Sequence, residues 1–380
     1  MKKFLRCVAY LAAFAYLCSG FCLYVSQIPT VYHCYPGQHP EGDLFYTLSA
    51  DAQAGKQTER NEYTAKIKLF GLLPFKNATI KQISQKQLTV LGTPFGVKLY
   101  TKGVIVVDAE EGSAGLEAGV QVGDIVLSYN NVEIHSNEEL RAQVEKSDGQ
   151  KQKIKILRNQ RVQSLWVTPT ETEDGYAIGL WVRDSAAGLG TLTYYDPQTN
   201  TLAGLGHSIS DVDTGLTMPV EKGTLVTARI TGVKEGEAGS PGELLGYLDE
   251  RELGQVRSNC EAGIFGDCDV DFKGVTYSVA LKNEIEVGPA QILCTLSGDT
   301  ARAYEIEISK INNNLEEYRN LCLTVTDPEL LEQTGGIVQG MSGSPILQNG
   351  KLVGAVTHVL INDPTKGYGI FIENMLSAAE

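Results

Sequence analysis

The chain has 380 residues and a net charge of -14, and 42% of its residues are hydrophobic and 21% charged. This composition is typical of a globular protein with about two domains, and it excludes a disordered or fibrous chain. The acidic balance and the lack of a basic patch in the body of the chain argue against a nucleic-acid-binding protein.

The first predicted element is an apolar segment at the N-terminus. Lys2, Lys3 and Arg6 precede an uncharged apolar run over residues 7–25. A helix needs about 20 apolar residues to cross a bilayer, whereas a cleaved signal sequence has an apolar region of about 7–15. We therefore predict a membrane anchor over residues 1–25, with the rest of the chain outside the cytoplasm. A cleaved signal sequence and a buried terminal helix are the alternatives.

Residues 26–90 begin with polar chain rich in proline and glycine and continue with alternating apolar residues. This pattern predicts a linker followed by a short β segment. The chain has eight cysteines, and they show no metal-type spacing. Cys260 and Cys268 could pair, and the sequence leaves their state open.

A distinct module is predicted over residues 91–169. An alternating strand at residues 97–100 is followed by "GSAGLEAGVQVGDIVLSYNN" and by "SNEELRAQVEK", a helix that Ser136 caps with Glu139 three residues later. These segments resemble a PDZ domain. The resemblance implies that a peptide adds as a strand to an exposed sheet edge, and that Phe95, Gly96 and Val97 form the peptide-binding loop. The alternative is that Gly96 only permits a tight turn.

Residues 170–380 are a succession of short β-rich runs separated by glycine, proline and asparagine turns. This spacing favours a sandwich or closed barrels over a parallel α/β sheet. The predicted fold is therefore mainly β.

The strongest chemical signal is "GIVQGMSGSPILQNGKLVGAVTHV", residues 336–359. Ser342 stands on a glycine-rich bend before a hairpin, where its hydroxyl and its backbone amide could both be available for acyl transfer. The segment resembles the nucleophile segment of chymotrypsin-fold serine peptidases. That resemblance implies a double β-barrel with Ser342 as nucleophile and the amides of Gly340 and Ser342 as oxyanion hole. A plain Gly/Ser turn is the alternative, and Ser344, two residues on, is the alternative nucleophile.

A nucleophilic serine needs a base, and the five histidines can be screened by position. His33 and His39 lie in the linker, His135 in the PDZ-like module, and His358 in the middle of a strand after the nucleophile. His207, in "LAGLGHSISD", follows a strand at a glycine-flanked turn and is the predicted base.

The third member of a triad would be a carboxylate that fixes the histidine tautomer, between His207 and Ser342 in chymotrypsin order. Asp327 is favoured because it ends a strand and precedes Pro328, although such an Asp is also a common turn residue. The other candidates are Asp211, Asp213, Asp249, Asp267, Asp269, Asp271 and Asp299.

Together with the anchor and the PDZ-like module, "AGLGHSISD", "TVTDPEL" and the nucleophile segment resemble the stage IV sporulation protein B peptidases of endospore-forming bacteria. The resemblance implies Ser342 as nucleophile, His207 as base and Asp327 as orienting acid, with Thr357 as a supporting residue. It implies a peptidase of the forespore intermembrane space that cleaves itself, within about residues 26–60. It further implies cleavage of a regulator of a membrane-embedded metalloprotease, which activates a sigma factor, and a PDZ ligand bound in cis or in trans.

Two other functions are compatible with parts of the sequence. A non-catalytic scaffold would use the PDZ-like module to tether partner proteins at the membrane. A metal-dependent hydrolase is disfavoured because no His, Asp or Glu cluster has ligand spacing, so neither a metal nor a cofactor is expected.

Overall fold

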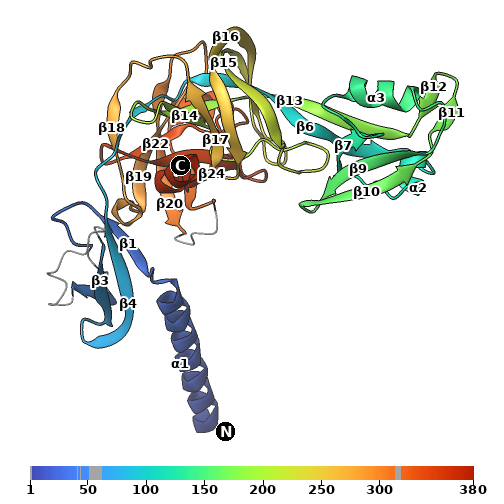
Figure 1. Ribbon diagram of the computed structural model, residues 1–380. Helices are drawn as coiled ribbons and strands as arrows, with labels where there is room; N and C mark the ends of the chain where they lie inside the picture. The colour runs from blue at the N-terminus through green and yellow to red at the C-terminus, as the bar shows by residue number, and fades with distance from the viewer. Residues whose placement is uncertain (1, 41, 43, 51–61, 313–317) are drawn as a thin grey trace.

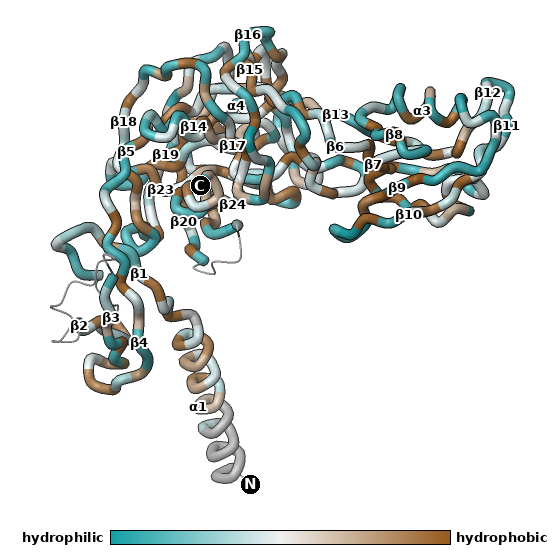
Figure 2. Tube along the Cα trace, viewed as in Figure 1, coloured by the Kyte–Doolittle hydropathy of each residue, from teal (hydrophilic) through white to brown (hydrophobic). Residues whose placement is uncertain are grey.

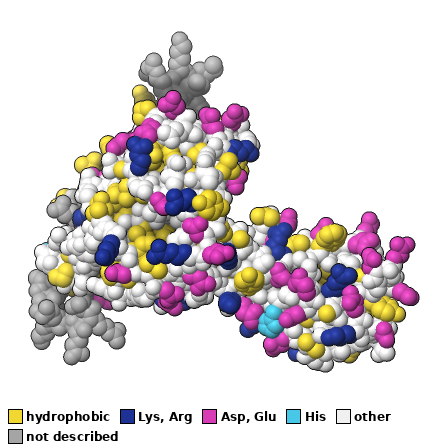
Figure 3. All heavy atoms as spheres, turned by 90° about the horizontal axis from the view of Figure 1, so that it is seen from above, with side chains coloured by type: hydrophobic (Ala, Val, Ile, Leu, Met, Phe, Trp, Pro, Cys, Tyr) yellow, Lys and Arg dark blue, Asp and Glu magenta, His cyan; other side chains and the backbone are white. Residues whose placement is uncertain are grey.

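The computed structural model describes residues 2–40, 42, 44–50, 62–312 and 318–380. Figure 1 shows three parts: a small N-terminal sheet with one long helix, a central body of strands, and an elongated lobe on the opposite side. Seen from above, the lobe projects from the body, and acidic side chains are spread over both parts (Figure 3).

Helix α1 (Lys2–Gln27) occupies the position of the predicted anchor. Among the described residues, no helix has a stretch both long enough and apolar enough to cross a membrane. The membrane anchor over residues 1–25 stays a prediction.

The predicted linker contains a folded module. It is a four-stranded sheet in the order β1-β4-β3-β2, with β1 parallel to β4 and the other pairs antiparallel. Alternation places Ala65, Ile67, Ala78 and Ile80 on one buried face. Part of the predicted self-cleavage segment, residues 51–60, lies outside the described residues. The strands are β1 (Val31–Cys34), β2 (Tyr46–Ala50), β3 (Glu62–Leu69) and β4 (Leu73–Gln82).

The elongated lobe is the PDZ-like module, built around the C-terminal half of the long strand β6 (Pro94–Ala109). The predicted cap of its main helix is confirmed, because Ser136 Oγ accepts a hydrogen bond from the Glu139 amide at 3.2 Å. The other elements are α2 (Ala114–Glu117), β7 (Ile125–Tyr129), β8 (Val132–Glu133), α3 (Asn137–Glu145), β9 (Gln152–Arg158), β10 (Arg161–Val167), β11 (Thr170–Thr172) and β12 (Gly175–Ala177).

The first half of β6 belongs to a closed barrel. Antiparallel pairings run β6-β13-β14-β17-β16-β15 and return from β15 to β6, so six strands close on themselves. Both β6 and β13 continue from this barrel into the PDZ-like sheet, so the two modules share strands across the boundary predicted at residue 169. The other strands are β13 (Leu180–Asp196), β14 (Thr201–Gly204), β15 (Val220–Lys234), β16 (Glu243–Cys260) and β17 (Gly263–Cys268).

This arrangement corrects the predicted peptide-binding loop. Phe95, Gly96 and Val97 are not in a loop but in β6, paired with β13 on one side and β15 on the other. Phe95 and Val97 are buried in the barrel core. Because both edges of this strand are already hydrogen-bonded, it offers no free edge to a peptide.

A second six-stranded antiparallel barrel follows, with pairings β19-β20-β21-β24-β23-β22 and back from β22 to β19. The two closed barrels agree with the double-barrel prediction. Strand β5 (Gln87–Val90) bridges them by pairing with β13 and with β18 (Thr276–Val279), which pairs with β23. The remaining elements are η1 (Lys282–Glu284), β19 (Gly288–Cys294), β20 (Arg302–Ile311), β21 (Leu321–Val325), α4 (Pro328–Thr334), β22 (Pro345–Gln348), β23 (Lys351–Val359), β24 (Lys366–Phe371) and α5 (Ile372–Ala379).

The fold also shows whether Cys260 and Cys268 are paired. Cys260 and Cys268 are both free thiols at opposite ends of the β16–β17 hairpin, where they face Gly263 and Gly254 across the strands.

Candidate active site

Ser342 lies on the loop that joins α4 to β22. Its side chain is partly exposed, whereas Met341 and Gly343 on either side are buried. Ser344 is completely buried, and its hydroxyl has no hydrogen-bond partner in the described part of the chain. Of the two candidate nucleophiles, only Ser342 is therefore accessible to a substrate.

The loop is held against the first barrel through its backbone. Thr191 of β13 donates its amide to the Ser342 carbonyl at 2.9 Å and its hydroxyl to the Gly340 carbonyl at 2.8 Å. Thr193 donates its hydroxyl to the Gly343 carbonyl at 2.7 Å. Gly343 has a φ of +95°, and a Cβ atom there would lie 1.9 Å from the Thr191 carbonyl oxygen. Only glycine fits at this close approach.

The predicted oxyanion hole has available donors. Within the described residues, the backbone amides of Gly340 and Ser342 donate no hydrogen bond to the protein, while the amides of Met341 and Gly343 are paired at 3.2 and 2.8 Å. Gly340 has a φ of +94°. Two unpaired amides two residues apart are the groups that an oxyanion of a tetrahedral intermediate requires.

His207 follows β14 and reaches the same region. Its Nδ1 lies 2.8 Å from the Ser208 carbonyl oxygen, and because a carbonyl can only accept, Nδ1 carries the proton. The neutral ring therefore has an unprotonated Nε2 that can act as a base. Burial lowers the pKa of His207 and outweighs the Ser208 hydrogen bond, which acts to raise it; the Arg319 charge adds a smaller lowering.

His358 of β23 lies beside His207, with the ring centroids 4.8 Å apart and the planes inclined by 36°. Its Nδ1 is buried without a hydrogen-bond partner among the described residues. Burial, followed by the charges of His207 and Arg319, lowers the pKa of His358 to about 4. His358 was not predicted as a site residue because it lies in the middle of a strand. The sequence signal that could have identified it is its place directly after Thr357, which the family resemblance implies as a supporting residue.

Thr357 connects the histidine pair to the nucleophile. The Ser342 hydroxyl donates to the Thr357 carbonyl oxygen at 2.7 Å, and Thr357 itself is buried with an unpartnered hydroxyl. A Cβ atom on Gly206, next to His207, would lie 3.0 Å from the Thr357 side chain. The structure thus brings the Ser342, His207 and His358 segments together. The Ser342 hydroxyl is bonded to a backbone carbonyl, and no hydrogen bond joins Ser342 to His207 in the described part of the chain.

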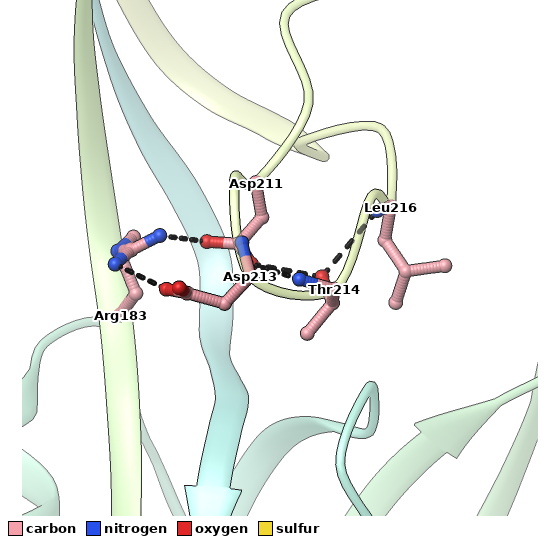
Figure 4. Close-up of polar contacts among 5 residues, drawn as sticks. All are labelled: Arg183, Asp211, Asp213, Thr214 and Leu216. Carbon is pink, nitrogen blue, oxygen red and sulfur yellow. Dashed lines mark hydrogen bonds and ion pairs between the residues drawn. The ribbon is translucent and has the colours of Figure 1, made fainter.

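The loop after His207 is held by a charged network (Figure 4). Arg183 of β13 forms ion pairs with Asp211 and, at 2.7 Å, with Asp213. The Asp211 side chain is fully buried and also accepts hydrogen bonds from the amide and the hydroxyl of Thr214, both at 2.9 Å. Burial acts to raise the pKa of Asp211, but the Thr214 and Arg183 contacts hold it below its ordinary value. Asn259 adds hydrogen bonds to both backbone groups of Ile209 at 2.8 Å.

Asp327 is not brought to His207. It is the N-cap of α4, where its carboxylate accepts hydrogen bonds from the amides of Leu330 at 3.0 Å and Glu305 at 3.1 Å. Burial acts to raise its pKa, but these amides hold the pKa below the ordinary value. Asp followed by Pro is a common helix start, with Pro at the first helical position, and the structure uses the pair in that way. Among the described residues no hydrogen bond or ion pair joins Asp327 to His207, so the Ser208 carbonyl occupies the position predicted for the carboxylate.

No group of three or more His, Cys, Asp or Glu side chains suited to a metal ion occurs in the described part of the chain.

A serine and a histidine on facing loops, with free amides beside the serine and two six-stranded barrels around them, define a serine peptidase. Residues 174–376, more than half of the chain, match the SpoIVB peptidase S55 family, and residues 87–168 match the PDZ domain. The chain belongs to the SpoIVB peptidase S55 family and carries a PDZ domain.

Two further similarities are more distant. A probable periplasmic serine endoprotease, DegP-like, from Pseudomonas putida is 28% identical over 165 residues, which cover 42% of this chain and 32% of the relative. The chain thus spans about a third of the length of that relative. The crystal structure of the PDZ domain of the SdrC-like protein from Listeria monocytogenes is 17% identical and covers 21% of this chain and 87% of its own, with a TM-score of 0.20.

Proposed function

We propose that the protein is a sporulation signalling serine endopeptidase in which Ser342 is the nucleophile and His207 the general base. The observation that carries the proposal is the accessible Ser342, whose own amide and that of Gly340 are unpaired, beside a histidine whose tautomer leaves Nε2 free. These groups supply the nucleophile, base and oxyanion donors of acyl transfer.

The reaction follows from these positions. Ser342 Oγ attacks the carbonyl carbon of the scissile peptide bond while its proton passes to His207 Nε2. The amides of Gly340 and Ser342 stabilise the negative charge on the former carbonyl oxygen. His207 then protonates the leaving amine as the C–N bond breaks, and a water molecule hydrolyses the acyl-enzyme by the same route.

One rearrangement must come before this reaction. Since the Ser342 hydroxyl donates to the Thr357 carbonyl, it must give up this hydrogen bond before it can donate to His207. We propose that this change accompanies substrate binding and that the structure represents the resting arrangement.

The family membership supports a more specific role. In this proposal the protein is held at a membrane outside the cytoplasm, in the forespore intermembrane space, and cleaves itself in the N-terminal segment. It then cuts a regulator of a membrane-embedded metalloprotease, which activates a sigma factor. The PDZ domain binds a peptide of this chain or of the target. A relative described as a probable periplasmic serine endoprotease supports the placement outside the cytoplasm.

The test compares two serines two residues apart. Ser342→Ala should lower kcat by about 10⁴-fold or more and abolish labelling by a fluorophosphonate, because Ser342 is the accessible serine at the free amides and Ser344 is buried. Ser344→Ala, at the buried serine, should retain labelling and most activity if it folds, which circular dichroism will show. Full activity of folded Ser342→Ala would overturn the assignment. Peptide binding by a wild-type protein that no fluorophosphonate modifies would instead favour the non-catalytic scaffold.

A further inference from the structure

The turn between β3 and β4 carries an exposed apolar surface. Its residues Phe70, Leu72, Leu73 and Phe75, here called the apolar tip, are 55%, 82%, 61% and 44% exposed. Hairpin turns are ordinarily polar, because they face water. Figure 2 shows the hydrophobic colour at this turn, at the end of the module away from the barrels.

The apolar tip is a built structure. The strands stay paired, with one register shift between Ile67 and Lys68, up to Leu69 opposite Leu73, and the Phe70 amide donates to the Phe45 carbonyl at 2.7 Å. Gly71 takes a φ of +71° to close the turn. The apolar side chains are therefore presented in a defined geometry.

The apolar tip is continuous with the end of α1. Phe21 of α1 stacks on Phe70 with ring centroids 5.7 Å apart, and Tyr24 of α1 meets Phe45 at 5.2 Å. Leu17 and Leu23 of the same helix are 69% and 65% exposed. Figure 1 shows α1 and the β3–β4 hairpin extending away from the barrels on the same side.

The charge around the apolar tip differs from that of the whole chain. Strands β3 and β4 contain one acidic residue, Glu62, and four lysines, in a chain with a net charge of -14. Lys76 lies with its ammonium group 5.5 Å from the centroid of the Phe75 ring. Aromatic and aliphatic side chains flanked by lysines are typical of a surface that enters the headgroup region of an anionic membrane. The lysines nearest the turn are Lys66, Lys68 and Lys76, of which Lys76 also donates to the Ile28 carbonyl. Lys81 lies at the other end of the hairpin, where it pairs with Glu62 at 3.4 Å.

We propose that the apolar tip, together with the adjoining end of α1, inserts into the surface of an anionic lipid bilayer. This docking deepens the proposed membrane location by assigning residues to the contact. A lipid surface fits better than a protein partner because the apolar tip is continuous with an exposed apolar helix and is flanked by positive charge. Peptide hydrolysis at Ser342 does not depend on this contact, so the two proposals can fail separately.

The experiment places a single tryptophan at the apolar tip of the full chain. Leu72→Trp, made in a Trp166→Phe and Trp181→Phe background, is added to phosphatidylcholine–phosphatidylglycerol vesicles with brominated acyl chains. Thr64→Trp in the same background is the matched control, because Thr64 is exposed on β3 roughly 17 Å from the turn. The tryptophan at 72 should be quenched by the bromines and the one at 64 should not.

A second arm measures binding itself. Leu72→Asp with Leu73→Asp should lower partitioning onto the anionic vesicles about tenfold or more, with hydrolysis of a soluble peptide unchanged. Partitioning should also weaken with added salt and on vesicles of phosphatidylcholine alone.

Several results would contradict the membrane-insertion proposal, and each can be told apart from the others. Failure of the full chain to bind vesicles, or bound protein with an unquenched tryptophan at 72, overturns the proposal. A shift in the emission of that tryptophan that grows with protein concentration without lipid would show a second copy covering the apolar tip, and also overturns it. Equal binding to neutral and anionic vesicles overturns the role of the lysines.

Discussion

The two loops that form the active site are stabilised in different ways. The loop after His207 is held by side chains, through the buried Asp211, its ion pair with Arg183, and Asn259. The loop around Ser342 is held by its backbone, through carbonyls that accept from Thr191 and Thr193 and through glycines at positive φ. The base is thus positioned by charge and the nucleophile by close steric fit.

This difference has consequences for the attachment of each loop. Arg183 lies on the part of β13 that pairs with Ile105 in the PDZ sheet, so the base loop is tied to a strand shared by both modules. The nucleophile loop is tied to Thr191 and Thr193, farther along the same strand inside the barrel. Strand β13 therefore supports both halves of the site, and the following substitutions separate the two kinds of support.

The largest effect on stability is expected at Gly343, where the backbone packs closely against Thr191. Gly343→Ala should lower the free energy of unfolding by about 3 kcal/mol or more and abolish fluorophosphonate labelling, because the new Cβ would meet the Thr191 carbonyl at 1.9 Å. Gly350→Ala is the control, since its φ is also positive, at +74°, but nothing lies within 4 Å of the added atom. It should cost only about 1 kcal/mol. Equal effects in thermal unfolding would show that close packing does not position the nucleophile.

A smaller effect is expected at the charged network. Asp211→Asn should lower the free energy of unfolding by about 1–3 kcal/mol, because it removes a buried charge whose partner Arg183 is about a third exposed. It should also reduce kcat more than it raises KM, since it loosens the loop next to the base. Asp213→Asn, at the half-exposed second partner, should change stability by less than about 0.5 kcal/mol. An unchanged kcat in destabilised Asp211→Asn would remove the link between this network and His207.

The contact between His207 and His358 predicts that the folded protein loses stability in acid. With the pKa of His358 lowered to about 4 in the folded protein, the unfolded chain binds the proton first as the pH falls below about 6.5. Stability should therefore decline between pH 6.5 and 4, and His358→Gln should flatten that decline in denaturant titrations. His135 is the opposite control: the Glu221 hydrogen bond raises its pKa, so its small contribution is present at low pH and is lost as the pH rises through the folded pKa. A His358→Gln curve as steep as the wild type would contradict the assignment.

Apart from the control variants, the smallest effect on stability is expected at Asp327. Asp327→Ala should cost about 1 kcal/mol through loss of the N-cap of α4, whereas Asp327→Asn, which can still cap, should cost much less. Neither should change kcat substantially if the carboxylate only caps the helix. A kcat reduced 100-fold or more in stable Asp327→Asn would show that Asp327 approaches His207 in the active protein, as the family resemblance implies.

Local sequence signals determined several features correctly. Short alternating runs with turn residues predicted a mainly β chain, because strand periodicity and turn chemistry act over few residues. The cap at Ser136 and the hairpin at Asn349-Gly350 follow from local rules and are found as predicted. The same reasoning placed Ser342 on a bend with free amides and His207 in the turn that follows a strand.

Tertiary structure alone decided the remaining features, because they depend on contacts between residues far apart in the chain. Phe95 to Val97 became a barrel strand when β13 and β15 took both of its edges. His358 reached His207 because the two closed barrels bring β14 and β23 together, and Asp327 went to a helix start instead. A sequence shows which residues are chemically able to act, but the closing of the barrels determines which of them meet.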